Sequence, residues 1–173
     1  MNKEVKKTAE PTLEVWRTVE LGFWSSVENI KNNLKRYDIN IVGAEDILNS
    51  KYFKISEKKE KLDLFKVPLH LLFGIFPKDK GVSFQQIRER AKQFGLEICP
   101  DEVGPLARLK ALGKDTDDTL FLAMEPYLNK QDDPCIFIID RLWFKEGTKE
   151  VLTSIKISPT YPDYSIFIFC RHK

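Results

Sequence analysis

The chain has 173 residues, of which 42% are hydrophobic and 31% charged, a composition typical of one globular domain. Its 28 basic and 26 acidic residues leave a formal net charge of +2, which gives no overall field to attract nucleic acid or an anionic membrane. Three cysteines lie far apart beside apolar residues, and the first residues contain no apolar leader segment. These features predict reduced thiols and a cytoplasmic protein without a membrane partner.

The first eleven residues differ in composition from the rest of the chain. Residues 1–11 mix lysine, glutamate and threonine and end at Pro11, a pattern typical of a disordered tail. Residues 12–173 are then expected to form a single α+β domain. The segment "EVWRTVELGF" opens this domain and indicates a strand in which Trp16 is an anchor.

Two helices are predicted next. Ser25 and Glu28 have the spacing of a capping box, and the following helix should end near Tyr37. A shorter helix fits residues 44–50. The segment "LDLFKVPL" then has the composition of a strand that ends at Pro68.

The clearest helix begins at Ser83 and ends at Gly95. Ser83 and Gln86 form a second capping box, and apolar residues recur at helical spacing behind them. Gly95 supplies the left-handed residue that commonly ends a helix.

The last third of the chain has the composition of strands. Four segments rich in isoleucine, phenylalanine and valine are separated by short polar or proline-containing turns: 119–127, 134–144, 150–158 and 164–173. Short connections favour antiparallel neighbours, so these segments predict a meander. The sequence therefore predicts an α+β fold in which N-terminal helices pack on a C-terminal, mainly antiparallel sheet.

The central stretch "ICPDEVGPLARLKAL" (98–112) has the residues of a sharp turn. Pro100 fits the start of a single helical turn, Gly104 could close it, and Pro105 could prevent its continuation. Residues 106–112 have helical spacing, but they precede a strand, and an extended segment paired with 119–126 is favoured. In that hairpin Arg108 would form a cross-strand ion pair with Glu125.

Several of these stretches resemble a family of small uncharacterised bacterial proteins. The similarity covers "WRTVELG" near the start, "GLEICPDEVGPLARL" in the middle, "LAMEP" after it and "PDYSIFIFCRHK" at the end. Members share a Trp-x-Thr-Val-x-Leu-Gly opening, a Leu/Ile-Cys-Pro-x-Glu-Val-Gly-Pro centre and a basic C-terminal strand. The resemblance implies a shared fold from Trp16 to Lys173. It implies no activity.

No recognisable catalytic, phosphate-binding or metal-binding motif occurs in the sequence. The glycines are scattered, and the two histidines, His70 and His172, do not have ligand spacing. The favoured hypothesis is therefore a non-catalytic interaction or accessory protein with no cofactor, whose partner is another protein. Glu102, Arg108 and Trp143 are the candidate binding residues.

An RNA-directed nuclease or toxin is the alternative hypothesis. Arg108, Glu125, Arg171 and His172 are polar residues within apolar segments, and such side chains on one sheet could act on RNA. A carboxylate or histidine would move the proton, and arginine would stabilise the negative charge of the phosphorane. Nucleic acid thus stays open as a partner, although the net charge does not favour it.

Overall fold

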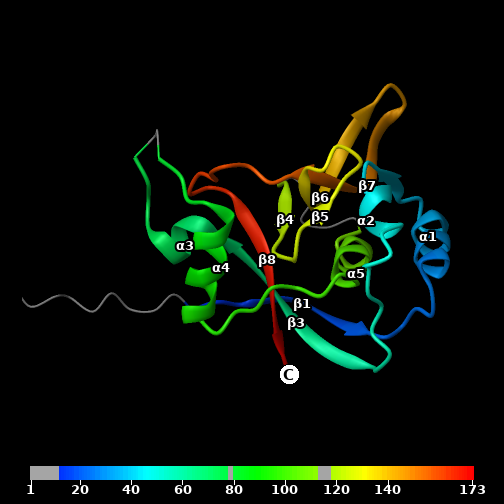
Figure 1. Cartoon of the computed structure of the whole chain (residues 1–173), viewed down its shortest axis with the longest axis horizontal. Coiled ribbons are helices and arrows are strands. Elements are labelled where there is room, and N and C mark those ends of the chain that lie inside the picture. The colour runs from blue at the N-terminus through cyan, green and yellow to red at the C-terminus, as the bar shows by residue number, and fades with distance from the viewer. Residues whose placement is uncertain (1–11, 78–79, 113–117) are drawn as a thin grey trace, which may run out of the picture.

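The computed structural model describes residues 12–77, 80–112 and 118–173, apart from the side chains of Trp143 and Phe144. Within these ranges eight strands form one sheet, and five helices pack around it (Figure 1). The strands are β1 (Val15–Leu21), β2 (Asn40–Val42), β3 (Glu60–Pro68), β4 (Leu120–Leu122), β5 (Tyr127–Leu128), β6 (Pro134–Phe144), β7 (Gly147–Lys156) and β8 (Ile166–His172). The helices are α1 (Val27–Arg36), α2 (Glu45–Leu48), α3 (Leu69–Phe73), α4 (Phe84–Gln93) and α5 (Val103–Lys110).

The sheet contains strands from both ends of the chain. Its order is β1-β3-β8-β4-β6-β7-β2, and β5 pairs with β6. Because β1, β2 and β3 belong to this sheet, the predicted separation into N-terminal helices and a C-terminal sheet is wrong. The pairs β2–β7 and β4–β8 are parallel, so the sheet is mixed, and the predicted meander is also wrong.

The connection between β7 and β8 explains why the meander does not form. β6 and β7 are joined by a tight hairpin, and β5 is joined to β6 by the short loop 129–133. The chain from Ile157 to Ser165 then crosses β6 and β4 to reach the place of β8 between β3 and β4. Turn composition indicates where a strand ends, but it does not specify which strand becomes the next neighbour.

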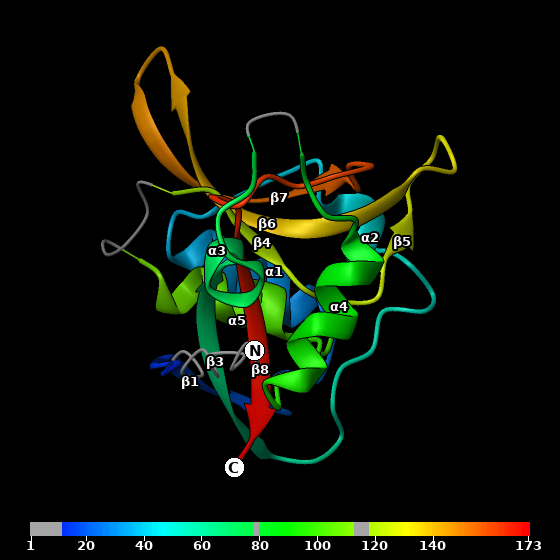
Figure 2. The same cartoon turned by 90° about the vertical axis from the view of Figure 1, so that its left-hand side faces the viewer.

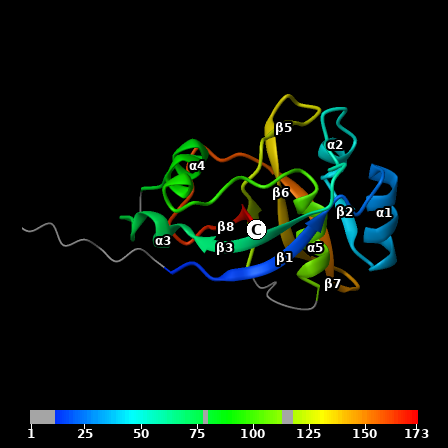
Figure 3. The same ribbon diagram turned by 90° about the horizontal axis from the view of Figure 1, so that it is seen from below.

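Helix α5 lies between the two ends of the curved sheet. It contacts β1 on one side and β6 and β7 on the other, and α1 also packs against it (Figure 3). All residues from Val103 to Arg108 are buried. Over these residues the helix has no solvated face, and it therefore lacks the apolar–polar period of a surface helix.

The opposite face of the sheet is covered in part by α3 and α4. Figure 2 shows both helices in front of β8, and the Phe84 ring of α4 packs 6.0 Å from the Phe167 ring of β8. The segment 157–165 crosses this same face nearer to β6 and β7. None of the helices in the described ranges has the length and apolar character needed to cross a membrane.

Several local predictions are confirmed. The strands β1, β3 and β6 occupy predicted segments, and Ser83 and Gln86 form the predicted capping box at α4. Gly95 adopts a left-handed φ of +67° directly after this helix. The cap of α1 is one residue later than predicted, because the Ser26 hydroxyl, not that of Ser25, accepts the Asn29 N–H bond, at 3.1 Å.

The outer parts of β6 and β7 leave the sheet as a two-stranded ribbon, defined here as residues 141–150. β4 pairs with β6 only at Ile138 and Ile139, and β2 pairs with β7 only at 151–153. Within the described part of the chain, the ribbon strands therefore pair only with each other. Figures 1 and 2 both show the ribbon projecting from the body of the molecule.

Candidate functional site

Glu102, at the start of α5, is a buried carboxylate with backbone partners. Its side chain is 1% exposed. It accepts the Gly22 N–H at 3.1 and 3.2 Å, and the Ser56 N–H at 3.0 Å. Glu102 thus joins the loop after β1 to the segment before β3. The two motifs "WRTVELG" and "ICPDEVGP" meet at this carboxylate.

The neighbouring Asp101 holds a second part of the same segment. Its Oδ2 accepts the Lys54 N–H at 2.8 Å and the Tyr127 hydroxyl at 2.6 Å. Burial, followed by the bond to Asp101, raises the pKa of Tyr127 above its ordinary value. The acidic pair of the central stretch therefore connects segments around a groove of about 650 Å³, which Ile98 to Asp101 help to line.

Gly104 and Pro105 lie inside α5, so the predicted stop at this position is wrong. Pro105 falls in the first turn of the helix, where a missing N–H removes no intrahelical bond. Gly104 packs against the Phe137 ring, and an added Cβ would lie 2.4 Å from Phe137 Cδ2. Glycine serves close packing here and not the left-handed turn that the sequence suggested.

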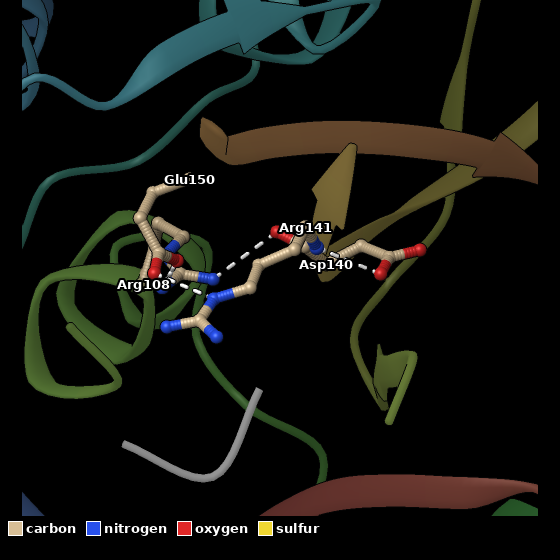
Figure 4. A network of polar contacts seen from close by, with 4 residues as sticks. All are labelled: Arg108, Asp140, Arg141 and Glu150. Carbon is tan, nitrogen blue, oxygen red and sulfur yellow. Dashed lines mark hydrogen bonds and ion pairs between the residues drawn. The ribbon is translucent and has the colours of Figure 1, made fainter. Parts of the chain in front are cut away.

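Arg108 projects from α5 to the base of the ribbon (Figure 4). The side chain has no exposed surface, forms an ion pair with Glu150 and donates to the Asp140 carbonyl at 3.3 Å. The same Glu150 accepts a bond from Arg141 Nε at 2.8 Å. We call Arg108, Arg141 and Glu150 the ribbon clamp.

In the ribbon clamp, the buried Arg108 and the less buried Arg141 share one carboxylate, that of Glu150. Burial lowers the pKa of Arg108, while Glu150 opposes this change and Arg141 adds to it. Arginine keeps its proton at neutral pH even after such a shift. Arg108 Nε has no hydrogen-bond partner within the described residues. The buried positive charge of the guanidinium is therefore stabilised through its Nη atoms, by Glu150 and the Asp140 carbonyl.

The predicted ion pair between Arg108 and Glu125 does not form. Residues 106–110 are helical and so cannot form the expected hairpin with 119–126. Glu125 instead pairs with Arg88 of α4, in an arrangement that includes an Arg88 Nη1 bond of 3.3 Å. The Glu125 side chain is largely exposed.

Arg171 and His172 lie at the end of β8. Arg171 donates to the carbonyls of Phe94 and Gly95 at 2.9 Å each. His172 Nδ1 lies 2.6 Å from Glu60 Oε1, and its Nε2 lies 3.6 Å from Glu97. These contacts join β8 to β3 and to the end of α4.

The four candidates for RNA cleavage thus bind separate partners within the described residues. Arg108 is enclosed at the ribbon base, and Glu125 pairs with Arg88 of α4. Arg171 donates to backbone carbonyls, and His172 lies beside Glu60. Of the other candidate binding residues, Glu102 holds two loops, whereas the side chain of Trp143 lies outside the described part.

The three cysteines are reduced and buried, as the sequence predicts. Burial raises the pKa of Cys99 well above its ordinary value, and a side-chain hydrogen bond with the Cys170 thiol adds to the rise. A thiol in that environment is a poor nucleophile. No group of three or more potential metal ligands occurs among the residues that the structure describes.

Of the ribbon clamp, the sequence singled out Arg108 but neither Arg141 nor Glu150. A signal for this pair does exist, because Glu150 is directly opposite Arg141 in the β6–β7 register, as an oppositely charged cross-strand pair. The contact with α5 has no local signal, since Arg108 is 42 residues from Glu150. Comparison of the chain with family models, curated proteins and solved structures finds no match.

Proposed function

We propose that the protein is a non-catalytic, cytoplasmic accessory protein that binds a partner protein through the ribbon, residues 141–150. The observation that supports this proposal is the ribbon clamp. A two-stranded hairpin is marginally stable when isolated. Here a buried arginine holds its base in one position, and both outer strand edges are free of other strands within the described residues.

The clamp is better suited to positioning than to stability. A buried ion pair commonly contributes no more stability than apolar side chains of similar volume. A fixed ribbon, in contrast, loses little conformational freedom when a partner binds it, and this lowers the cost of association. The buried charge of Arg108 is thus explained by its effect on the ribbon, which it holds in one conformation before a partner binds.

The composition of the ribbon favours a protein partner over nucleic acid. The segment "RLWFKEGTKE" has three basic and two acidic residues. Glu150 pairs with Arg141, and Glu146 pairs with Lys149 at 3.1 Å. Paired lysine and arginine side chains are poorly suited to neutralise phosphates. Tryptophan and phenylalanine, which follow Leu142 in this sequence, are enriched in protein interfaces.

Site-specific photocrosslinking in living source cells tests this proposal. A benzophenone residue replaces Lys145 in the ribbon or, as the control, the exposed Lys35 on α1. We expect one defined protein adduct from position 145 and none from position 35. The identified partner should then bind the purified wild-type chain, and Trp143→Ala should weaken this binding about tenfold or more.

The proposal also specifies the results that would overturn it. Equal adducts from positions 145 and 35 would mean that no partner protein binds the ribbon specifically. A purified partner whose affinity is the same for wild type and for Trp143→Ala, both with native circular dichroism, would place the interface elsewhere.

A further inference from the structure

A second site lies on the other side of the sheet from the ribbon clamp. A hollow of about 630 Å³ opens over β4, β6 and β7, and the segment 157–165 forms its wall. Strand alternation puts Asp140 on this face and Arg141 and Glu150 on the opposite one. Figure 4 shows the Asp140 side chain pointing away from the Arg108 guanidinium. We call this hollow the sheet pocket.

The wall of the sheet pocket is fixed in place by backbone bonds. Tyr161 and Val82 exchange two N–H···O bonds of 2.8 and 3.0 Å. Asp163 accepts the His70 N–H at its carbonyl, at 2.8 Å, and the Phe76 N–H at its carboxylate, at 3.2 Å. These bonds hold the wall in place without a ligand, as is common for small-molecule pockets.

The lining of the pocket is largely apolar and aromatic. Phe121 stacks on Phe167 with ring centroids 5.2 Å apart, and the Tyr161 ring meets Phe121 edge-on at 5.3 Å. Ile138 adds aliphatic surface. The Tyr164 side chain, 76% exposed, lies at the pocket with its ring accessible.

One carboxylate in this lining, Asp140, forms no close ion pair within the described residues, and Arg108 acts on it only at longer range. Asp140 accepts the Thr119 hydroxyl at 3.0 Å and the Arg141 N–H at 2.7 Å, but forms no ion pair within the described residues. The other charged groups of the pocket are paired, Asp118 with Lys66 at 3.0 Å and Lys156 with Asp133 at 2.6 Å. A half-buried carboxylate amid apolar side chains is stabilised by a cation.

We propose that the sheet pocket binds an alkylammonium group, with Asp140 as its counter-ion. The aliphatic stem of such a ligand would pack on Phe121 and Ile138, and the exposed Tyr164 ring would offer a cation–π contact. A metal ion fits less well, because hard cations take several oxygen ligands at once. The group belongs either to a free amine or to a lysine side chain of another protein.

Titration calorimetry on the whole chain tests this proposal. Cadaverine is the free amine, the capped peptide acetyl-Gly-Lys-Gly-amide presents the same group on a peptide, and 1-pentanol is the neutral control. We expect at least one of the two amines to bind and 1-pentanol to bind at least about tenfold more weakly. If cadaverine alone binds, the ligand is a free amine; if the peptide alone binds, the source is a protein lysine.

Substitutions locate the binding at the proposed residues. Asp140→Asn keeps the acceptor oxygen for Thr119 but loses the charge, and we expect about tenfold weaker amine binding. Tyr164→Ala should weaken binding severalfold, whereas Glu28→Gln, the same charge change on α1, should have no effect. Failure of both amines to bind the wild-type chain, or equal binding by wild type and Asp140→Asn, would overturn the proposal.

Discussion

At the scale of single residues, the described part of the chain contains two buried charged side chains with different environments. Glu102 accepts backbone N–H groups from two loops, which is a favourable environment for a carboxylate and holds distant segments together. Arg108 has a carboxylate and a carbonyl as partners, and one of its N–H groups has none within the described residues. Glu102 therefore contributes mainly to stability, and Arg108 mainly to position.

Replacing Glu102 with alanine should destabilise the fold by about 3 kcal/mol, because the Gly22 and Ser56 N–H groups would lose a charged acceptor. Urea unfolding followed by circular dichroism measures this change. The matched control is Glu57→Ala, since Glu57 is an exposed glutamate in the same loop as Ser56. Equal midpoints for the two variants would contradict a structural role for Glu102.

At the scale of secondary-structure elements, α5 and the ribbon depend on each other. α5 fills the space between β1 and β7, and it places Arg108 at the ribbon base. Its close approach to β6 requires glycine at position 104, where the Phe137 ring leaves no room for a Cβ. The element that holds the sheet together thus also positions the ribbon.

Gly104→Ala tests how closely α5 packs on β6. Alanine within a helix is ordinarily more favourable than glycine by about 1 kcal/mol. Overpacking against Phe137 should cost more than this, about 1–3 kcal/mol, and so produce a net loss of stability. Adding Phe137→Leu should recover part of the loss, which a double-mutant cycle of urea midpoints would detect. A stabilised Gly104→Ala variant would show that the contact is loose.

Glu150→Gln tests the ribbon clamp as an anchor. The substitution leaves Arg108 buried without a counter-ion, so we expect a loss of about 3 kcal/mol or more. Hydrogen exchange should rise in residues 141–150 and stay unchanged in α1. The double variant Arg108→Met, Glu150→Gln should recover stability because it removes the buried charge. Purely additive losses would mean that the two side chains do not interact.

At the scale of the whole molecule, several acidic groups stay protonated because the fold buries them. Burial raises the pKa of Cys99 well above 9.0 and the pKa of Tyr161 above 10.0. Near pH 9 and above, the unfolded chain releases these protons while the folded chain keeps them. The free energy of unfolding is thus fully retained below about pH 9 and falls as the pH rises above this value.

Urea unfolding between about pH 7 and about pH 10 measures this alkaline instability. Each buried group should contribute up to about 1.4 kcal/mol per pH unit above its unfolded pKa. The Cys99→Ala variant should show a shallower decline than the wild-type chain, because it lacks one such group. Parallel declines for the two proteins would mean that Cys99 loses its proton equally easily in both states.

The sequence by itself determined the elements that depend on local pattern. The alternating or apolar runs of β1, β3 and β6 and the capping box of α4 appear in the structure where the sequence predicts them. Hydroxyl caps, left-handed glycines and side-chain periods act within a few residues, so a single sequence contains this information.

Only the tertiary structure decided the order of the strands, the helical state of 103–110 and the partner of Arg108. α5 is buried from Val103 to Arg108, so the helical spacing of its apolar residues is not accompanied by a solvated polar face that would distinguish a helix from a strand. The charge of Arg108 in this helix is neutralised by Glu150, which belongs to a strand far away in the sequence. Packing around a central helix joins residues far apart in the chain, and such contacts leave no periodic trace in the sequence.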